Sequence, residues 1–168
     1  LIKAAAAHSN GLLGHLNKAQ AQAIENAALA IAAGQFAEQF PVDVYQTGSG
    51  TSSNMNINEV IASVVLRKNK RIVHPNNHVN LGQSSNDVVP SASLLSTALV
   101  LQCKLLPALK NLQKTIECKA KTLKRHIKTG RTHLMDAMPI SMEQELLAWS
   151  AQLGSASARF NECAKRLQ

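Results

Sequence analysis

The chain has 168 residues, of which 45% are apolar and only 3% are aromatic. A core can therefore form, but Ala and Leu must supply most of it, which favours packed helices over a β-sandwich. Eighteen Lys and Arg against ten Asp and Glu give a formal net charge of +8, so nucleic acid is the first partner to consider. Nine of those cations lie between Lys104 and Arg131, with no aromatic residue among them. A solvated helix face explains this pattern better than a surface that stacks bases, and we expect no nucleic-acid partner.

The cysteines and the apolar runs indicate the compartment. Cys103, Cys118 and Cys163 form an odd set without C-x-x-C spacing, and the first two lie about 22 Å apart on one predicted helix. We therefore expect reduced thiols, a cytosol-like compartment and no structural zinc. No uninterrupted run of about 18 apolar residues occurs, so we expect no membrane-spanning segment and no membrane partner. Because the chain starts without Met and ends within a helical pattern, we expect a piece of a longer protein.

The first predicted elements are two short helices followed by a connector. Asn17 is a good N-cap for the second helix, which fills 18–33, and Gly34 is a typical helix stop. The connector around Pro41 leads into the first of three polar segments.

Two polar loops then alternate with helices. The first, TGSGTSSNMN, fills 47–56 and runs into a helix predicted from about residue 54 to 67. The second, HPNNHVNLGQSSND, fills 74–87. We predict a helical N-terminal domain over 1–88 that contains both loops, and a partial helical-bundle domain over 89–168.

The second domain is predicted to start with one very long helix. No strong stop signal interrupts residues 91–126, and Pro107 is expected to bend the helix rather than end it. About 36 residues at 1.5 Å each span roughly 54 Å, which is too long for a chain of this size to cover. Partner helices are therefore expected over its apolar seam, which is formed by Leu95, Ala98, Gln102, Leu105, Leu109, Leu112, Ile116 and Leu123.

The third polar segment lies in KTGRTHLMDAMPISMEQELLAW, residues 128–149. We expect a loop that carries Thr132 and His133, followed by a helix that starts with an S-x-x-Q capping box of Ser141 and Gln144. Together with the two earlier loops, this segment offers many short neutral donors and one group that titrates near neutral pH. A site that binds a dicarboxylate and moves a proton needs such a set. For any single loop, however, ordinary caps and turns explain the same residues better.

The three segments together resemble the conserved regions of the aspartase/fumarase superfamily, and most closely class II fumarate hydratase. The matching text is QTGSGTSSNMNINEVIA, HPNNHVNLGQSSND and KTGRTHLMDAMPISMEQELLAW, in family order and at family-like spacing. The resemblance implies an all-α, L-aspartase-like fold, here a small helical domain and the first long helices of a bundle cut short. It further implies a homotetramer, reversible hydration of fumarate to L-malate in the tricarboxylic acid cycle, and neither cofactor nor metal. The implied compartment is the cytoplasm, or the mitochondrial matrix in a eukaryote.

The resemblance also implies roles for individual residues. His133 becomes the catalytic proton-transfer residue. The family pattern places on the substrate carboxylates Ser49, Gly50, Thr51, Ser84, Ser85, Asn86 and Thr132. A second dicarboxylate site is formed by Arg71, His74, Pro75, Asn76 and Asn77. The family often has Asp where Asn77 stands, and its downstream GSS-x-MP-x-K-x-NP signature, with the base serine, lies outside this sequence, so we expect the chain alone to be inactive.

Two alternatives stay open at this point. Aspartate ammonia-lyase shares the elimination chemistry, but aspartases typically have a different first loop and GRTQ instead of the GRTH that ends at His133. A non-catalytic helical scaffold of the same fold is the other, although it would have no reason to keep Thr51, Asn86 and His133.

Overall fold

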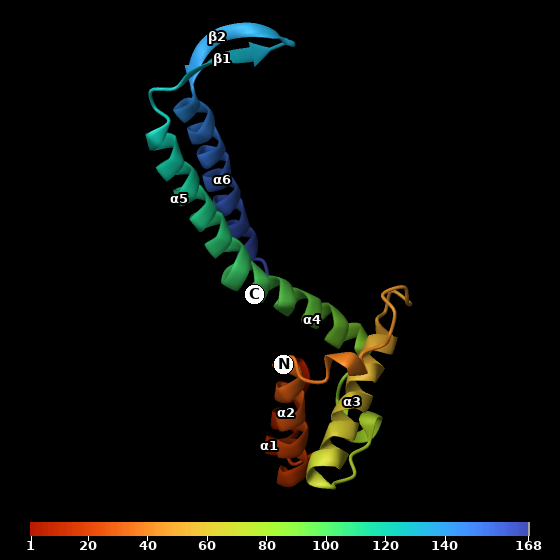
Figure 1. Cartoon of the computed structure of the whole chain (residues 1–168). Coiled ribbons are helices and arrows are strands. Elements are labelled where there is room, and N and C mark those ends of the chain that lie inside the picture. The colour runs from red at the N-terminus through yellow and green to blue at the C-terminus, as the bar shows by residue number, and fades with distance from the viewer. Residues whose placement is uncertain (168) are drawn as a thin grey trace. The chain divides into compact units, whose positions relative to one another are not determined.

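The computed structural model describes residues 1–167 and divides the chain into two compact units, Leu1–Ser93 and Leu94–Gln168. The elements, in chain order (Figure 1), are α1 (Ile2–Leu12), α2 (Lys18–Ala32), η1 (Ala37–Gln39), α3 (Thr51–Asn69), η2 (Pro75–Val79), α4 (Ser85–Val100), η3 (Leu101–Leu105), α5 (Leu106–Thr122), β1 (Ile127–Thr132), β2 (Met135–Ser141) and α6 (Met142–Ala164). The predicted all-α architecture is confirmed, and one short antiparallel hairpin is added to it.

The first unit is built on three helices that pack through small side chains. Gly11 of α1 lies so close to α2 that a Cβ on it would stand 2.6 Å from the Cβ of Ala21. Branched residues of α3 fill the remaining space, and Ile24 of α2 and Ile61 of α3 are fully buried. The core consists entirely of residues between Ala4 and Val79.

The predicted helix boundaries in this unit follow local signals. The Asn17 side chain accepts the Gln20 backbone N–H at 2.9 Å and α2 ends at Ala32, so the predicted cap and stop are confirmed. Helix α3 begins at Thr51, three residues earlier than predicted. Gly50 precedes it in the left-handed conformation, with φ of 65°, which lets the polar loop turn directly into the helix.

The second unit contains a helical hairpin in which α5 and α6 lie side by side (Figure 1). The predicted capping box is confirmed, since Ser141 Oγ accepts the Gln144 N–H at 3.1 Å and Gln144 Oε1 accepts the Ser141 N–H at 2.8 Å. The contact between the helices is partly polar: buried Ser150 donates to Glu117 Oε1 at 2.8 Å. Most apolar residues of the predicted seam remain exposed or half-buried in this chain.

The predicted absence of a membrane-spanning helix is not confirmed. Within residues 1–167, the continuous helix Ser85–Thr122 is long and apolar enough to cross a bilayer by length and composition, with a mean hydropathy of 1.5 in its most apolar window, of which only 6% is buried. Scattered Ser, Thr and Gln residues keep each run of consecutive apolar residues short, which is why the sequence pattern predicted no membrane span. These residues lower the mean hydropathy of the helix only a little. Pro107 lies at the start of α5, and a π-helical turn, η3, precedes it in place of a stop.

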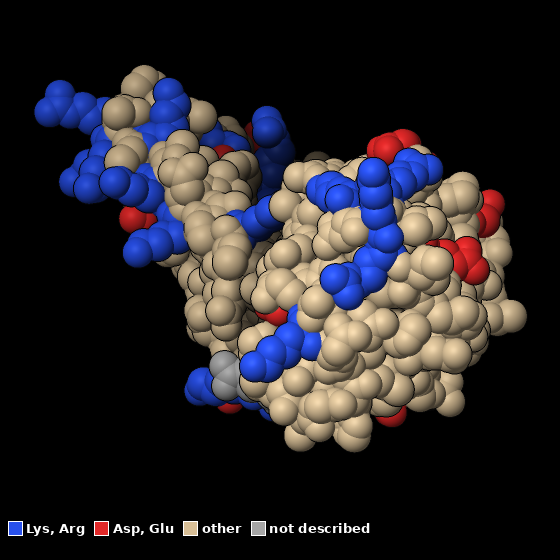
Figure 2. Space-filling model, turned by 90° about the horizontal axis from the view of Figure 1, so that it is seen from below, with Lys and Arg blue, Asp and Glu red and all other residues tan. Residues whose placement is uncertain are grey.

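Charged side chains lie mainly on the surface. Figure 2 shows Lys and Arg spread over the visible face, with uncharged residues between them. Of the nine cations between Lys104 and Arg131, eight are exposed and Lys128 is half-buried. These exposures agree with the solvated face inferred from the sequence.

Candidate functional site

The first polar loop presents a row of hydroxyl groups directly before a helix. Thr47 Oγ1 lies 3.2 Å from Ser49 Oγ, which lies 3.1 Å from Thr51 Oγ1, the first residue of α3. The loop is held at its base by Gln46, whose amide nitrogen donates to Ser53 Oγ at 2.9 Å. Ser49 and Thr51 are exposed, so their hydroxyls are open to a ligand.

The second polar loop ends in the same way, at the start of α4. Ser84 Oγ accepts the Asn86 N–H at 3.3 Å, and the Ser84 carbonyl accepts the Val88 N–H at 2.9 Å. Ser84 and Asn86 are exposed and Ser85 is half-buried. Three consecutive donors thus surround the N-terminal end of a helix, where backbone N–H groups favour an anion.

The two loops meet within the first unit. A Cβ on Gly50 would stand 2.7 Å from Val89 Cγ1, so the start of α3 packs directly on the first turn of α4. Asn54 Nδ2, one turn into α3, donates to Ser85 Oγ at 2.9 Å. The structure therefore brings together the predicted residues of loops 47–56 and 84–86, with two helix N-termini beside them. Paired positive helix ends and neutral donors suit a carboxylate ligand.

A buried amide network supports this junction. Asn80 Oδ1 accepts from Lys3 Nζ at 2.8 Å and from the amide nitrogens of Asn54 and Asn58, each at 3.2 Å. Lys3 is 5% exposed, Asn54 3% and Asn58 fully buried. Burial lowers the pKa of the Lys3 ammonium to about 8, because desolvation disfavours its charged form.

Sequence reasoning missed this network entirely. Lys3 and Asn80 are separated by 77 positions, so no local pattern connects them. The only signal was compositional: a lysine at the start of the alanine-rich run AAAA, on the face of α1 that also buries Ala4 and Ala7.

Thr132 and His133 lie in the second unit, on a hairpin that the sequence analysis described as a loop. Strands β1 and β2 pair antiparallel, and Thr132 faces Met135 across a two-residue turn of His133 and Leu134. Both turn residues have positive φ, 50° and 60°. A tight turn of this kind normally takes Asn-Gly, which is why His-Leu gave no hairpin signal. His133 is exposed at the tip.

Gly130 and Lys128 have structural roles near the base of the hairpin. The strand register shifts between Thr129 and Arg131, and a Cβ on buried Gly130 would stand 2.6 Å from the Met138 carbonyl oxygen. Lys128 Nζ contacts Glu145 Oε2 of α6 at 3.0 Å, which ties the hairpin to the helix that follows. Gly130, the glycine of the GRTH motif, therefore allows the two strands to approach closely at this β-bulge.

The residues predicted for a second dicarboxylate site surround the short helix η2. His74 Nδ1 accepts the N–H groups of Asn76 and Asn77, each at 3.2 Å, so Nδ1 carries no proton and Nε2 is left as the donor. Pro75 occupies the first helical position. Arg71, His74, Asn76 and Asn77 are exposed. His74 thus has a structural role as a cap, whatever else it binds.

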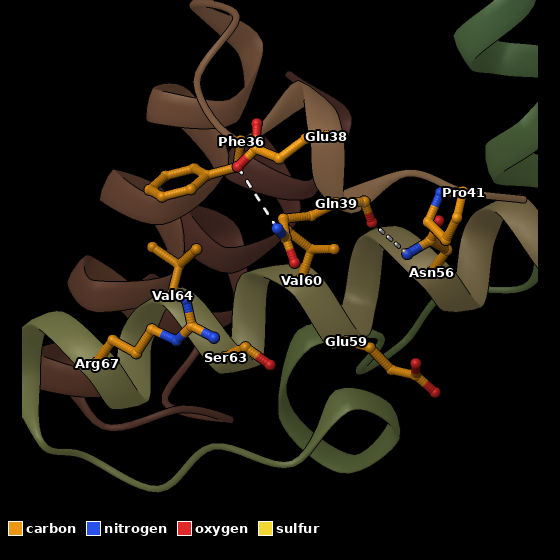
Figure 3. A pocket seen from close by; sticks show the side chains of 10 residues that line it. All are labelled: Phe36, Glu38, Gln39, Pro41, Asn56, Glu59, Val60, Ser63, Val64 and Arg67. Carbon is orange, nitrogen blue, oxygen red and sulfur yellow. Dashed lines mark hydrogen bonds between the residues drawn. The ribbon is translucent and has the colours of Figure 1, made fainter.

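Two cavities of the first unit lie beside α3. One of about 280 Å³ separates the connector after α2 from one face of α3 and is lined by Phe36, Glu38, Gln39, Pro41, Asn56, Glu59, Val60, Ser63, Val64 and Arg67 (Figure 3). Figure 3 also shows Asn56 Nδ2 donating to the Gln39 carbonyl, at 3.1 Å, which fixes the connector on α3. A second, of about 380 Å³, reaches Pro75 beside η2. Among the residues described, no group of three or more His, Cys, Asp or Glu is placed to hold a metal.

Comparison with protein families gives a match over the whole chain: residues 1–168 match a family described as Lyase. Among curated relatives, the class II fumarate hydratase of Xylella fastidiosa (strain Temecula1) is 61% identical over 166 residues, covering 99% of this chain and 35% of that protein. That of Thermus thermophilus is 46% identical, covering 99% of this chain and 37% of that protein. The chain thus spans about a third of the length of these relatives. The resemblance drawn from the three polar segments is confirmed.

Solved structures agree with the fold. A fumarate lyase:delta crystallin from Brucella melitensis superimposes with a TM-score of 0.91 at 42% identity, covering 99% of this chain and 40% of that one. A recombinant class II fumarase from Schistosoma mansoni gives a TM-score of 0.90 at 40% identity, covering 99% of this chain and 36% of that one.

Proposed function

Because the chain belongs to the lyase family over residues 1–168, we propose that it forms part of a fumarate hydratase that reversibly converts fumarate to L-malate. The observation that carries the proposal is the meeting of two donor-rich helix N-termini, marked by the 2.9 Å bond from Asn54 Nδ2 to Ser85 Oγ. The relatives named as class II fumarate hydratases support the choice of reaction.

The first unit would hold the substrate carboxylates. The hydroxyls of Ser49, Thr51, Ser84 and Ser85 and the amide of Asn86 are uncharged donors, so they bind an anion without burying an opposite charge. Removal of the C3 proton of L-malate leaves a carbanion whose charge spreads onto the adjacent carboxylate. Fixed donors around that carboxylate stabilise it as the charge develops.

The second unit would supply the proton transfer at the other end of the reaction. In the hydration direction a water oxygen bonds to C2 of fumarate while C3 gains a proton, and His133 takes the proton that the attacking water releases. Thr132 would donate to a substrate carboxylate. The base that exchanges the C3 proton belongs to the downstream signature of the family resemblance.

The remaining assignments are also proposals. Arg71, His74, Pro75, Asn76 and Asn77 form a second dicarboxylate site, in which His74 donates through Nε2. The units correspond to a helical domain over 1–88 and a partial bundle over 89–168. The exposed seam of Ser85–Thr122 is covered by other helices in a homotetramer located in the cytoplasm.

An assay of the full-length protein with fumarate, L-malate and L-aspartate tests the reaction. We expect hydration of fumarate without ammonia release from aspartate, and a loss of about 10²–10⁴-fold in the His133→Asn variant. Asn favours the positive φ found at this turn, so the variant should keep the hairpin. Ammonia release would indicate an aspartate ammonia-lyase, and inactivity on all three substrates would indicate a non-catalytic scaffold.

The same assay on residues 1–168 alone should detect no hydration, since the downstream signature is required. Measurable turnover by this chain would contradict the division of the site between it and the rest of the protein.

A further inference from the structure

We propose that Lys3 is a positioning residue that acts through Asn80 and Asn54 to keep the Ser85 hydroxyl pointing its hydrogen at the substrate carboxylate. The inference rests on the proposed function and deepens it. It adds Lys3, a residue 77 positions before Asn80 in the sequence, to those that control substrate binding.

The contacts form an unbroken path of hydrogen bonds from Lys3 to Ser85. Lys3 Nζ donates to Asn80 Oδ1 at 2.8 Å, and Asn54 Nδ2 donates to the same oxygen at 3.2 Å. The second hydrogen of Asn54 Nδ2 goes to Ser85 Oγ at 2.9 Å. Asn80 Nδ2 donates to the Gln83 carbonyl at 3.0 Å, so the same amide also fixes the backbone just before Ser84.

The direction of these bonds follows from the charge on Lys3. An ammonium group donates only, so it requires the oxygen of the Asn80 amide to face it. That oxygen in turn requires the NH₂ group of Asn54, rather than its carbonyl oxygen, to face Asn80. Ser85 Oγ then accepts from Asn54, and its own hydrogen is not used in the network. A hydroxyl that accepts on one side is left to donate on the other, which is what a carboxylate needs.

The buried amide oxygens that lack a hydrogen-bond partner support these donor and acceptor directions. Within residues 1–167, the buried oxygens Asn54 Oδ1 and Asn58 Oδ1 have no hydrogen-bond partner. If only local satisfaction mattered, turning the Asn54 amide over would offer its oxygen to the Ser85 hydroxyl as a donor. The arrangement instead gathers three donors on Asn80 Oδ1, where the cation is. Leaving buried acceptors unpaired costs about 1–3 kcal/mol each, and the amides keep this orientation despite that cost because the Lys3 ammonium holds the Asn80 oxygen as their common acceptor.

The burial of Lys3 gives the network its strength. Lys3 is 5% exposed, and its one hydrogen bond among the described contacts is to an uncharged amide. In a site of low dielectric, a charge orients neighbouring dipoles more strongly than it does in water. The lowered pKa of this lysine has the same cause, desolvation.

The test compares variants of the full-length protein by fumarate kinetics. Lys3→Met keeps an unbranched side chain that is one atom shorter and removes the charge, whereas Lys3→Arg keeps the charge. Lys18→Met, at an exposed lysine of α2, is the matched control. We assign the Ser85 hydroxyl to the carboxylate that is not adjacent to C3, a contact made equally in ground and transition states. We therefore expect Lys3→Met to raise KM about tenfold with little change in kcat. Lys3→Arg should recover most of this loss and Lys18→Met should show none.

A double-mutant cycle with Ser85→Ala separates positioning from general destabilisation. If Lys3 acts through Ser85, adding Lys3→Met to Ser85→Ala should raise KM by less than about twofold. Asn54→Leu is the second variant, in case Lys3→Met does not fold. It keeps the branched shape and the number of heavy atoms of the side chain, removes an unsatisfied oxygen and should also raise KM about tenfold.

The outcomes distinguish this inference from the function on which it rests. A wild-type protein that hydrates fumarate, with KM unchanged in Lys3→Met and Asn54→Leu, overturns the role of Lys3 alone. Additive effects in the cycle, or a lower kcat at constant KM, also overturn it, since a structural role predicts fewer active molecules. Calorimetric titration with succinate measures dicarboxylate binding in the absence of turnover. A wild type that neither hydrates fumarate nor binds succinate overturns the proposed function and this inference together.

Discussion

The polar loops of the first unit and the hairpin of the second unit are held in opposite ways. The loop junction of the first unit rests on Asn54, Asn58 and Lys3, all nearly or fully buried, and on direct packing of Gly50 against Val89. The hairpin of the second unit is exposed along most of its length and has positive φ at both turn residues. The donors proposed to bind substrate are thus fixed by a core, whereas His133, the residue proposed to transfer a proton, lies on an exposed turn with positive φ. The difference suggests that substrate affinity depends on rigidity and that the chemical step depends on an element free to adjust.

The largest effect should come from Gly50→Ala. The new Cβ would meet Val89 at 2.7 Å while the backbone keeps a φ of 65°, so strain and overpacking combine to a loss of about 2–5 kcal/mol of stability. Denaturant unfolding measures the loss. Gly48→Ala is the matched control, because a Cβ there meets nothing within 4 Å and φ is not positive. Equal losses in both variants would remove the claim that the junction is tightly packed.

The next effect is a pH dependence of stability from Lys3. Its pKa is about 8 in the folded chain, against 10.5 for a lysine in water, so between these pH values the unfolded state binds more protons. Stability should therefore rise with pH across that interval, by about 3 kcal/mol at most, and should show no slope from this group below pH 8. Denaturation at several pH values, with Lys3→Met as reference, isolates the effect. A variant with the same slope as the wild type would contradict it.

A smaller, local effect is expected from Gly130→Ala. Its Cβ would lie 2.6 Å from the Met138 carbonyl oxygen, so the hairpin must shift at the bulge, at a cost of about 1–3 kcal/mol. Because the hairpin contributes no residue to the core cluster, the global unfolding transition should move little. Hydrogen exchange should show faster exchange of the β1 and β2 amides alone. Loss of protection in α1–α3 would show that the two regions are not independent.

The smallest effect should be Leu134→Gly, which relieves the positive φ of an exposed residue. The gain is up to about 1 kcal/mol in hairpin stability, partly offset by the greater freedom of Gly when unfolded. Hydrogen exchange of Thr132 and Met135 measures it. Slower exchange with reduced kcat would support the view that the strain serves the chemical step, and faster exchange would contradict the strain itself.

How far the sequence predicted this structure depended on the range of the interactions. The Asn17 cap and the Ser141–Gln144 box depend on neighbours three residues away, and both were predicted correctly. The meeting of the two polar loops could be inferred only through family resemblance. The Lys3–Asn80 contact, across 77 positions, had no local signal at all. The hairpin was missed because its His-Leu turn lacks the usual Asn-Gly signal and because Gly130 is an unfavourable residue inside a strand.

The confinement of the first core to residues between Ala4 and Val79 has a consequence for biosynthesis. That unit can close on the ribosome as soon as its last core residue has emerged, without waiting for anything downstream. The apolar helix Ser85–Thr122 emerges next, and only 6% of its most apolar window is covered by this chain. During this interval the nascent chain presents a folded first unit followed by an apolar helix that this chain leaves largely exposed. We therefore expect chaperones to bind this helix first.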